Sequence, residues 1–319
     1  SRIAVVAQDA VHHLRHPLGR HLCLDAVAEA NGVLVAVVAG QEYLVGGNLV
    51  AVAFGRGTVE SDVRDVVASA AVGATAHLHM QLADAGISPT NWQASTFPKP
   101  YRSKITIAHD GIDTDVMIPD PEVNLTLSNG KIKLTRQDEI VTFVNRNLEP
   151  YRGYHIFMRA LPEILKRRPN AQILIVGGDG KEGPSYGALP DGGGSWKEIF
   201  KAEIGSGMAE ADWARVHYSN NIPYQTFIKL LQLSTVHVYL TYPFILGWSL
   251  LEAMSVGCSI VASATPPVLE VIRDNETGQV FDFFDVHGLA DQVCELLGDE
   301  AKRNILGQQA RDFARSTYD

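Results

Sequence analysis

The sequence predicts an α/β protein made of two Rossmann-like, doubly wound domains that face a cleft. The chain has 319 residues, about twice the length of a typical single domain. Short, continuous apolar runs alternate with helical patterns in both halves, and continuous apolar strands indicate parallel sheets that are covered on both faces. We therefore predict an amino-terminal domain with a connector over residues 1–138 and a carboxyl-terminal domain over residues 139–319.

The amino-terminal half begins with a β-α-β pattern. The strand "RIAVVA" is followed by the helical stretch "HLCLDAVAEANG" and by a second strand, "VLVAVVAG". A third strand is expected over Leu49–Gly55 and a fourth within Lys104–Asp115. The stretch that follows contains prolines and an Asn-Gly pair, which predict a connector with a small hairpin. This domain is unusually short.

The carboxyl-terminal half repeats the alternation more regularly. "IVTFVNR", "AQILIVGG" and "VHVYLTY" read as buried strands, and "GYHIFMRALPEILKRRP" and residues His287–Gly298 read as helices. Ligands in doubly wound sheets bind at the carboxyl ends of the strands. The site is therefore expected after these strands.

Composition excludes several classes of protein. Apolar residues make up 46% and charged residues 20% of the chain, as in ordinary globular proteins. The net charge of −9 argues against nucleic acid as a general partner. The three cysteines have no metal-ligand spacing, and no apolar run approaches the ~20 residues of a membrane span. These features predict a cytoplasmic protein without a metal or cofactor.

One basic cluster leaves a membrane partner open. The residues "LKRRP" (Leu165–Pro169) would suit peripheral contact with a membrane surface. They equally suit a solvated helix end, where cations interact favourably with the helix dipole.

The stretch "PFILGWSLLEAMSVGCSIVAS" (Pro243–Ser263) carries the main candidate site. A helix is predicted from Ser249 to Gly257, directly after a buried strand. Gly247 allows close backbone approach, and helix N-termini present unpaired N–H groups to anions. We therefore predict a phosphate site at this helix mouth, with the amides of Trp248, Ser249 and Leu250 as donors.

Glu252 has two interpretations. It lies three residues after Ser249, the spacing of a capping box in which the carboxylate bonds the helix N-terminus. Its two oxygens also suit the paired hydroxyls of a ribose.

Three linked stretches resemble one known family. "LGWSLLEAMSVGCSIVAS", "PPVLEVIRDNETGQVFDF" and "FVNRNLEPYRGYHIFMRALPEILKRRPNAQILIVGG" are similar, in order and spacing, to motifs of the retaining glycosyltransferases of the GT-B fold, family 4. The similarity covers nearly everything from Thr142 to Tyr318. It implies transfer of a sugar from a nucleotide-diphospho-sugar to an acceptor, which the sequence does not identify.

The resemblance also implies roles for individual residues. Arg146 and Arg152 would be the catalytic cations that stabilise the departing diphosphate. Glu252 would hold the donor ribose, and the other donor-binding residues would be Gly178, Gly247, Trp248, Ser249 and Leu250.

One position departs from the family's pattern. Phe244 stands where the family has the first motif glutamate, which indicates either a subfamily variant of the motif, the favoured interpretation, or weakened catalysis. A non-catalytic nucleotide-sugar binding protein and a nucleotide-sugar epimerase of the same architecture therefore remain alternatives.

The amino-terminal half resembles the same family more weakly. In "HPLGRHLCLDAVAEANGVLVAVVAG", Gly19 and Arg20 correspond to the family's glycine loop, and "HDGID" corresponds to its H-x-G-I-D. Gly19, Arg20 and His109 are therefore expected to border the cleft. The alternative for the loop is a simple turn.

Overall fold

The structure is a computed structural model of the chain. It describes residues 83–127, 132–180, 190, 193–243 and 246–319, together with the backbone of four strands before residue 53. The chain divides into two compact units, Ser1–Asp110 and Gly111–Asp319, which are described separately.

The first unit contains a four-stranded parallel sheet in the order β2-β1-β5-β6. A second pair of strands, β3 and β4, forms an antiparallel hairpin. The strand expected over Leu49–Gly55 is thus β4, outside the parallel sheet. The described elements of this unit are β1 Ile3–Val5, β2 Val35–Ala36, β3 Gln41–Val45, β4 Asn48–Val52, β5 Ala85–Ser88, α4 Asn91–Thr96, α5 Lys99–Arg102 and β6 Ile105–Ile107.

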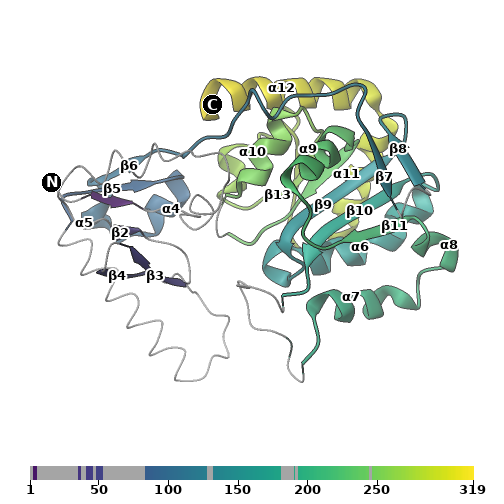
Figure 1. The fold of residues 1–319 in the computed structure, drawn as a ribbon, viewed down its shortest axis with the longest axis horizontal. Coiled ribbons are helices and arrows are strands. Elements are labelled where there is room, and N and C mark those ends of the chain that lie inside the picture. Colours follow the sequence, from purple (N-terminus) through teal and green to yellow (C-terminus); the bar gives the residue numbers. More distant parts are fainter. Residues whose placement is uncertain are drawn as a thin grey trace. The chain divides into compact units, whose positions relative to one another are not determined.

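The second unit is built on a six-stranded parallel sheet in the order β11-β10-β9-β12-β13-β14 (Figure 1). Its strands are β9 Ile140–Asn147, β10 Gln172–Gly178, β11 Val216–Ser219, β12 Val236–Tyr239, β13 Ile260–Ser263 and β14 Gln279–Phe281. A two-stranded hairpin, β7 Asn124–Leu127 and β8 Ile132–Thr135, precedes them. The chain runs outward from β9 to β11 and then returns to the other side of β9 with β12. The topological switch point therefore lies between β9 and β12.

Helices cover both faces of this sheet (Figure 1). One core lies beneath α6 and α11, and the other lies beneath α9, α10 and α12. Successive residues of β10 enter opposite cores: Ile173 and Ile175 join the first, and Leu174 and Val176 join the second. This confirms the prediction of a parallel sheet buried on both faces. The helices are η2 Pro150–Arg152, α6 Tyr154–Arg167, α7 Trp196–Gly205, α8 Glu210–Trp213, α9 Tyr224–Leu233, α10 Trp248–Ser255, η3 Val268–Glu270, α11 Val286–Gly298 and α12 Glu300–Tyr318.

The division at residues 110 and 111 lies ahead of the boundary predicted at 138 and 139. The segment between them packs on the second unit. Met117 is fully buried, and its carbonyl accepts a hydrogen bond of 2.7 Å from the Ser255 hydroxyl. Gln232 Nε2 donates to the carbonyl of Ile118 at 2.8 Å. The predicted connector therefore belongs to the second unit, because its apolar residues complete that core.

Candidate functional site

The loop after β9 is held tightly against the end of β12. Gly153 adopts the left-handed conformation, with φ of 70°, and a Cβ atom there would lie 2.3 Å from the Cβ of Leu240. The amide of Tyr242 donates to the carbonyl of Tyr151 at 2.9 Å. Glycine at this position lets η2 sit directly on the carboxyl end of β12.

The two predicted catalytic arginines lie on either side of the β9 end, Arg146 in the strand and Arg152 in the loop that follows it. Arg146 is exposed near the end of β9, and Arg152 is half-buried in η2. Arg152 Nη1 donates to Thr241 Oγ1 at 3.3 Å, which ties the guanidinium to the first residues after β12. A permanent positive charge thus lies at the topological switch point of the sheet.

Gly178 lies at the end of β10, beside the same loop. Its carbonyl accepts from the amide of Leu148 at 2.9 Å, and a Cβ atom on Gly178 would lie 2.9 Å from Asn147 Oδ1. The missing side chain therefore leaves room for the Asn147 amide, which is buried between the two strands. Through these contacts Gly178 packs against the end of β9, next to the loop that carries Arg152.

The helix mouth differs in detail from the prediction. Helix α10 begins at Trp248, and its N-cap is Gly247 in an extended conformation with φ of −84° and ψ of 142°. Ser249 is therefore the second helical residue, and the predicted start at Ser249 is wrong. The proposed capping box is wrong as well, because Glu252 does not stand three residues after the N-cap.

The amides of two residues predicted to bind the donor, Gly247 and Leu250, are already engaged within the protein. The Gly247 amide donates to Tyr239 Oη at 2.9 Å, and the Leu250 amide donates to the Gly247 carbonyl at 3.1 Å. Their predicted role as phosphate donors is corrected accordingly. Trp248 and Ser249 are the first two residues of α10.

Glu252 is half-buried on α10 and is bonded to a tyrosine of the neighbouring helix. Tyr224 Oη donates to Glu252 Oε1 at 2.8 Å. Burial raises the pKa of Glu252 to about 7, and the hydrogen bond from Tyr224 opposes this rise. The carboxyl group therefore changes charge near neutral pH.

Several residues of this region carry no sequence signal for a site. Tyr224, Tyr239 and Thr241 bond Glu252, Gly247 and Arg152, respectively, yet in sequence they read as core or turn residues. Four aromatic rings also form a cluster at the loop that carries Arg152, with Tyr242 stacked on Phe283 at 4.7 Å between ring centroids. The other two rings are those of Tyr151 and Phe284.

The remaining predicted site residues fall elsewhere. Gly19, Arg20 and Phe244 lie outside the described residues. His109 belongs to the first unit, with its Nδ1 3.3 Å from Asp110 Oδ1, and burial lowers the pKa of its imidazole.

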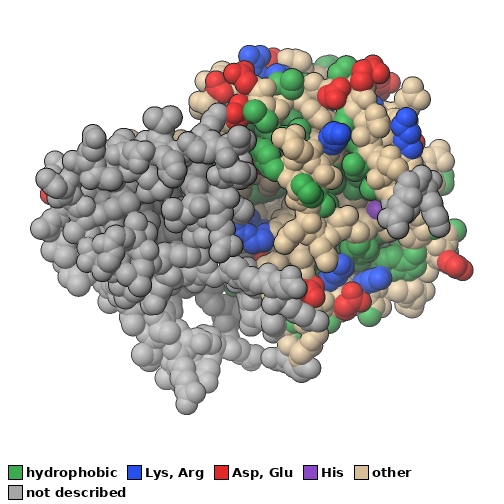
Figure 2. All heavy atoms as spheres, in the orientation of Figure 1, with side chains coloured by type: hydrophobic (Ala, Val, Ile, Leu, Met, Phe, Trp, Pro, Cys, Tyr) green, Lys and Arg blue, Asp and Glu red, His purple; other side chains and the backbone are tan. Residues whose placement is uncertain are grey.

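Two basic residues of the cluster over Leu165–Pro169, Arg167 and Arg168, are paired within the protein. Arg167 bonds Asp291 at 2.5 Å and Glu163 at 3.1 Å, and Arg168 bonds Glu139. These ion pairs favour the helix-end interpretation of the cluster over membrane contact. On the face in Figure 2, acidic and basic side chains of the described residues are interspersed rather than gathered.

The described residues contain neither a membrane-spanning helix nor a cluster of metal-ligating side chains. Among the helices there, none combines the length and apolar character needed to cross a membrane. No group of three or more His, Cys, Asp or Glu side chains in these ranges is placed to hold a metal ion.

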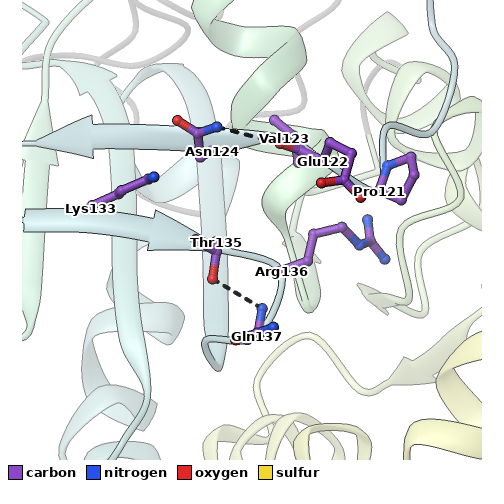
Figure 3. A pocket seen from close by; sticks show the side chains of 8 residues that line it. All are labelled: Pro121, Glu122, Val123, Asn124, Lys133, Thr135, Arg136 and Gln137. Carbon is purple, nitrogen blue, oxygen red and sulfur yellow. Dashed lines mark hydrogen bonds between the residues drawn. The ribbon is translucent and has the colours of Figure 1, made fainter.

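A shallow cavity of about 310 Å³ lies apart from this site, on the β7–β8 hairpin (Figure 3). Lys133 and Asn124 line this cavity from the two neighbouring strands of the hairpin, and Glu122 and Arg136 line it from the flanking turns. The Arg136 guanidinium donates to the carbonyl of Gln232 at 2.6 Å, so it holds the hairpin against helix α9.

Comparison with known protein families gives two matches along the chain. The model described as glycosyl transferases group 1 matches residues 128–313. The model described as glycosyl transferase family 4 group matches residues 35–117.

Curated relatives are about a quarter identical to the chain within the aligned regions. D-inositol 3-phosphate glycosyltransferase of Corynebacterium efficiens is 25% identical over 67% of this chain and 47% of its own length. A GDP-mannose-dependent alpha-(1-6)-phosphatidylinositol monomannoside mannosyltransferase of Mycolicibacterium smegmatis is 26% identical over 72% of this chain and 57% of its own. The chain thus spans about half the length of the curated relatives it matches.

Solved structures share the fold. Sucrose-phosphate synthase from Thermosynechococcus elongatus superimposes with a TM-score of 0.64 at 14% identity, over 100% of this chain and 95% of that one. The Anabaena protein Alr3699/HepE, in complex with UDP and glucose, gives a TM-score of 0.60 at 17% identity, over 77% of this chain and 64% of that one.

Proposed function

The chain belongs to the glycosyl transferases group 1 family, whose model matches residues 128–313, and from that premise we propose that it is a retaining glycosyltransferase. It would move a sugar from a nucleotide-diphospho-sugar to an acceptor. The fold is the GT-B fold of such enzymes, with a parallel sheet in each unit.

The observation that supports this function best is the position of Arg152. Its guanidinium is tied to Thr241 at the switch point, and the chain continues from Thr241 to the mouth of α10. Breaking a glycosyl–phosphate bond places negative charge on the departing diphosphate. Fixed cations and helix N–H groups stabilise that charge more in the transition state than in the bound donor.

Each part of the donor then has a protein group of suitable chemistry. Arg152 and Arg146 would bind the diphosphate together with the first turn of α10, which begins at Trp248. Glu252 would accept hydrogen bonds from the ribose hydroxyls. No step of this proposal needs a metal or cofactor.

The relatives support a nucleotide-sugar as the donor, but they do not identify its base. One is named for its dependence on GDP-mannose, and one structural neighbour holds UDP and glucose. Retention of the anomeric configuration is supported by the family resemblance. The acceptor stays unassigned.

The experiment that tests the function is nucleotide binding followed by product analysis. Millimolar UDP, GDP or ADP should raise the melting temperature of the protein, and no shift with any of them would contradict the proposal. Incubation with the corresponding nucleotide-sugars and candidate acceptors should then release nucleoside diphosphate. A new nucleotide-sugar formed without an acceptor would instead indicate an epimerase.

A non-catalytic nucleotide-sugar binding protein is the second candidate, and the replacement of the family's glutamate by Phe244 favours it. This candidate predicts a thermal shift without turnover. Transfer or donor hydrolysis by the purified chain would eliminate it.

A further inference from the structure

We propose that Tyr224 is a positioning residue of the donor site, whose hydroxyl holds Glu252 so that the rest of the carboxylate faces the ribose hydroxyls. This inference rests on the proposed function, and it adds a residue that the family motifs do not include.

The phenol of Tyr224 is fixed on two sides. Its ring packs on Phe227, with 6.0 Å between centroids and 29° between ring planes. Its hydroxyl oxygen lies 3.5 Å from the sulfur of Met117, a fully buried residue. The ring is therefore already oriented when its hydroxyl meets Glu252 at 2.8 Å.

Met117 also connects this contact to the far end of α10. Its carbonyl accepts from Ser255, which lies three residues after Glu252 and thus on a neighbouring part of the same helix face. The connector, α9 and α10 consequently fix the donor and acceptor of the Tyr224–Glu252 bond from both sides.

The chemistry of the carboxylate explains why such a bond suits ribose recognition. A phenol has one proton to donate, and an ionised carboxylate is a much stronger acceptor than a thioether. Tyr224 uses one of about four acceptor positions on the carboxylate. The remaining positions match the two O–H donors of a vicinal diol, and the tethered side chain loses less rotamer freedom when the diol binds.

The test is the substitution Tyr224→Phe, which keeps the ring and removes only the hydroxyl. Calorimetry would measure the Kd of wild type and variant for UDP, GDP and ADP, and for the 2′,3′-dideoxy form of each. We expect the variant to bind the ribose form about tenfold more weakly, because the Glu252 carboxylate loses the hydrogen bond that orients it toward the ribose hydroxyls. Binding of the dideoxy form should stay unchanged.

Tyr218→Phe is the matched control. Its hydroxyl bonds Tyr154 Oη at 3.2 Å, away from Glu252. This variant should bind both forms as the wild type does.

The outcomes separate the two proposals. If Tyr224→Phe weakens both forms equally, Tyr224 has only a structural role and the inference is overturned. It is also overturned if the variant discriminates the two forms as well as the wild type does. If the wild type binds no nucleoside diphosphate, the proposed function itself fails.

Discussion

Polar side chains have different roles at the two ends of the central sheet. At the amino end, Thr142 Oγ1 lies 2.7 Å from Ser234 Oγ and 2.8 Å from His237 Nδ1, and all three residues are buried. At the carboxyl end of the same strands, Arg152 is only half-buried and bonds a hydroxyl group, Thr241 Oγ1. One end uses its polar groups to join strands, and the other holds charge in a fixed position.

The amino end is closed by the segment before β9. The Ile140 amide donates to Thr235 Oγ1 at 3.0 Å, and that hydroxyl donates to the carbonyl of Asp138 at 3.0 Å. Burying polar groups is tolerated there because they bond one another. The difference indicates that removing a polar group at the amino end should change stability, whereas removing one at the carboxyl end should change ligand binding and turnover.

The largest effect is expected at Arg152. Arg152→Met should lower kcat about 10²–10³-fold, because a fixed charge that stabilises the departing diphosphate is lost. Arg152→Lys should lower it less, since the charge stays and the planar fork is lost. Steady-state kinetics with a nucleotide-sugar would measure both. Arg159→Met is the control, since Arg159 pairs with Glu203 on the surface, and its kcat should stay at the wild-type value.

Gly153→Ala should have the second-largest effect, on stability. The new methyl group would meet Leu240 at 2.3 Å in a left-handed backbone conformation, which should cost about 2–3 kcal/mol of unfolding free energy. Urea unfolding would measure the loss. Gly205→Ala places its methyl group where nothing lies within 4 Å, so its stability should be unchanged or slightly higher. Equal stability of the two variants would contradict the tight packing of η2 on β12.

The pH dependence of donor binding should reflect Glu252. Its pKa of about 7 means that the carboxyl is protonated below neutrality, whereas ribose hydroxyls donate to the ionised form. The Kd for a nucleotide-sugar should therefore be flat above about pH 7 and rise up to about tenfold per pH unit below it. The Kd of the Glu252→Gln variant should not change with pH in this range. If its Kd still rises below pH 7, the pH dependence belongs to another group.

The same carboxyl group links pH to stability. Its folded-state pKa lies above the ordinary value of 4.5, so its favourable contribution is complete below pH 4.5 and is lost as the pH rises through about 7. Glu252→Gln should therefore raise the melting temperature at pH 8 relative to the wild type, with little difference at pH 4.

Thr142→Val tests the amino end. The change removes the hydroxyl that joins Ser234 and His237, and it should lower the unfolding free energy by about 1–2 kcal/mol. The Kd for nucleotides should stay the same. A change in Kd without a change in stability would reverse the assignment of roles to the two ends.

The smallest effect is expected at the hairpin cavity. Lys133→Ala alters an exposed side chain that lines this cavity, and it should change nucleotide binding by less than about 0.5 kcal/mol. A large loss of binding would show that the hairpin contributes to the site.

Much of the fold could be predicted because its signals are local. Buried parallel strands leave apolar runs, and a glycine between β12 and α10 marks a helix mouth. The start of α10 could not be predicted, because the Gly247 amide donates to the Tyr239 hydroxyl across the loop between β12 and α10, and the capping pattern at Ser249 does not show this contact. The bond from Tyr224 to Glu252 spans two helices and likewise leaves no trace in a short window of sequence.

Because of the strand order, the residues predicted to bind the donor lie on separate crossover segments. Arg152 follows β9, Tyr224 follows β11, and Trp248 follows β12. Each segment can accept insertions or exchanges while the others keep their anchoring bonds. A descendant of this scaffold could thus acquire a different sugar or base preference piecemeal, by replacing one crossover at a time.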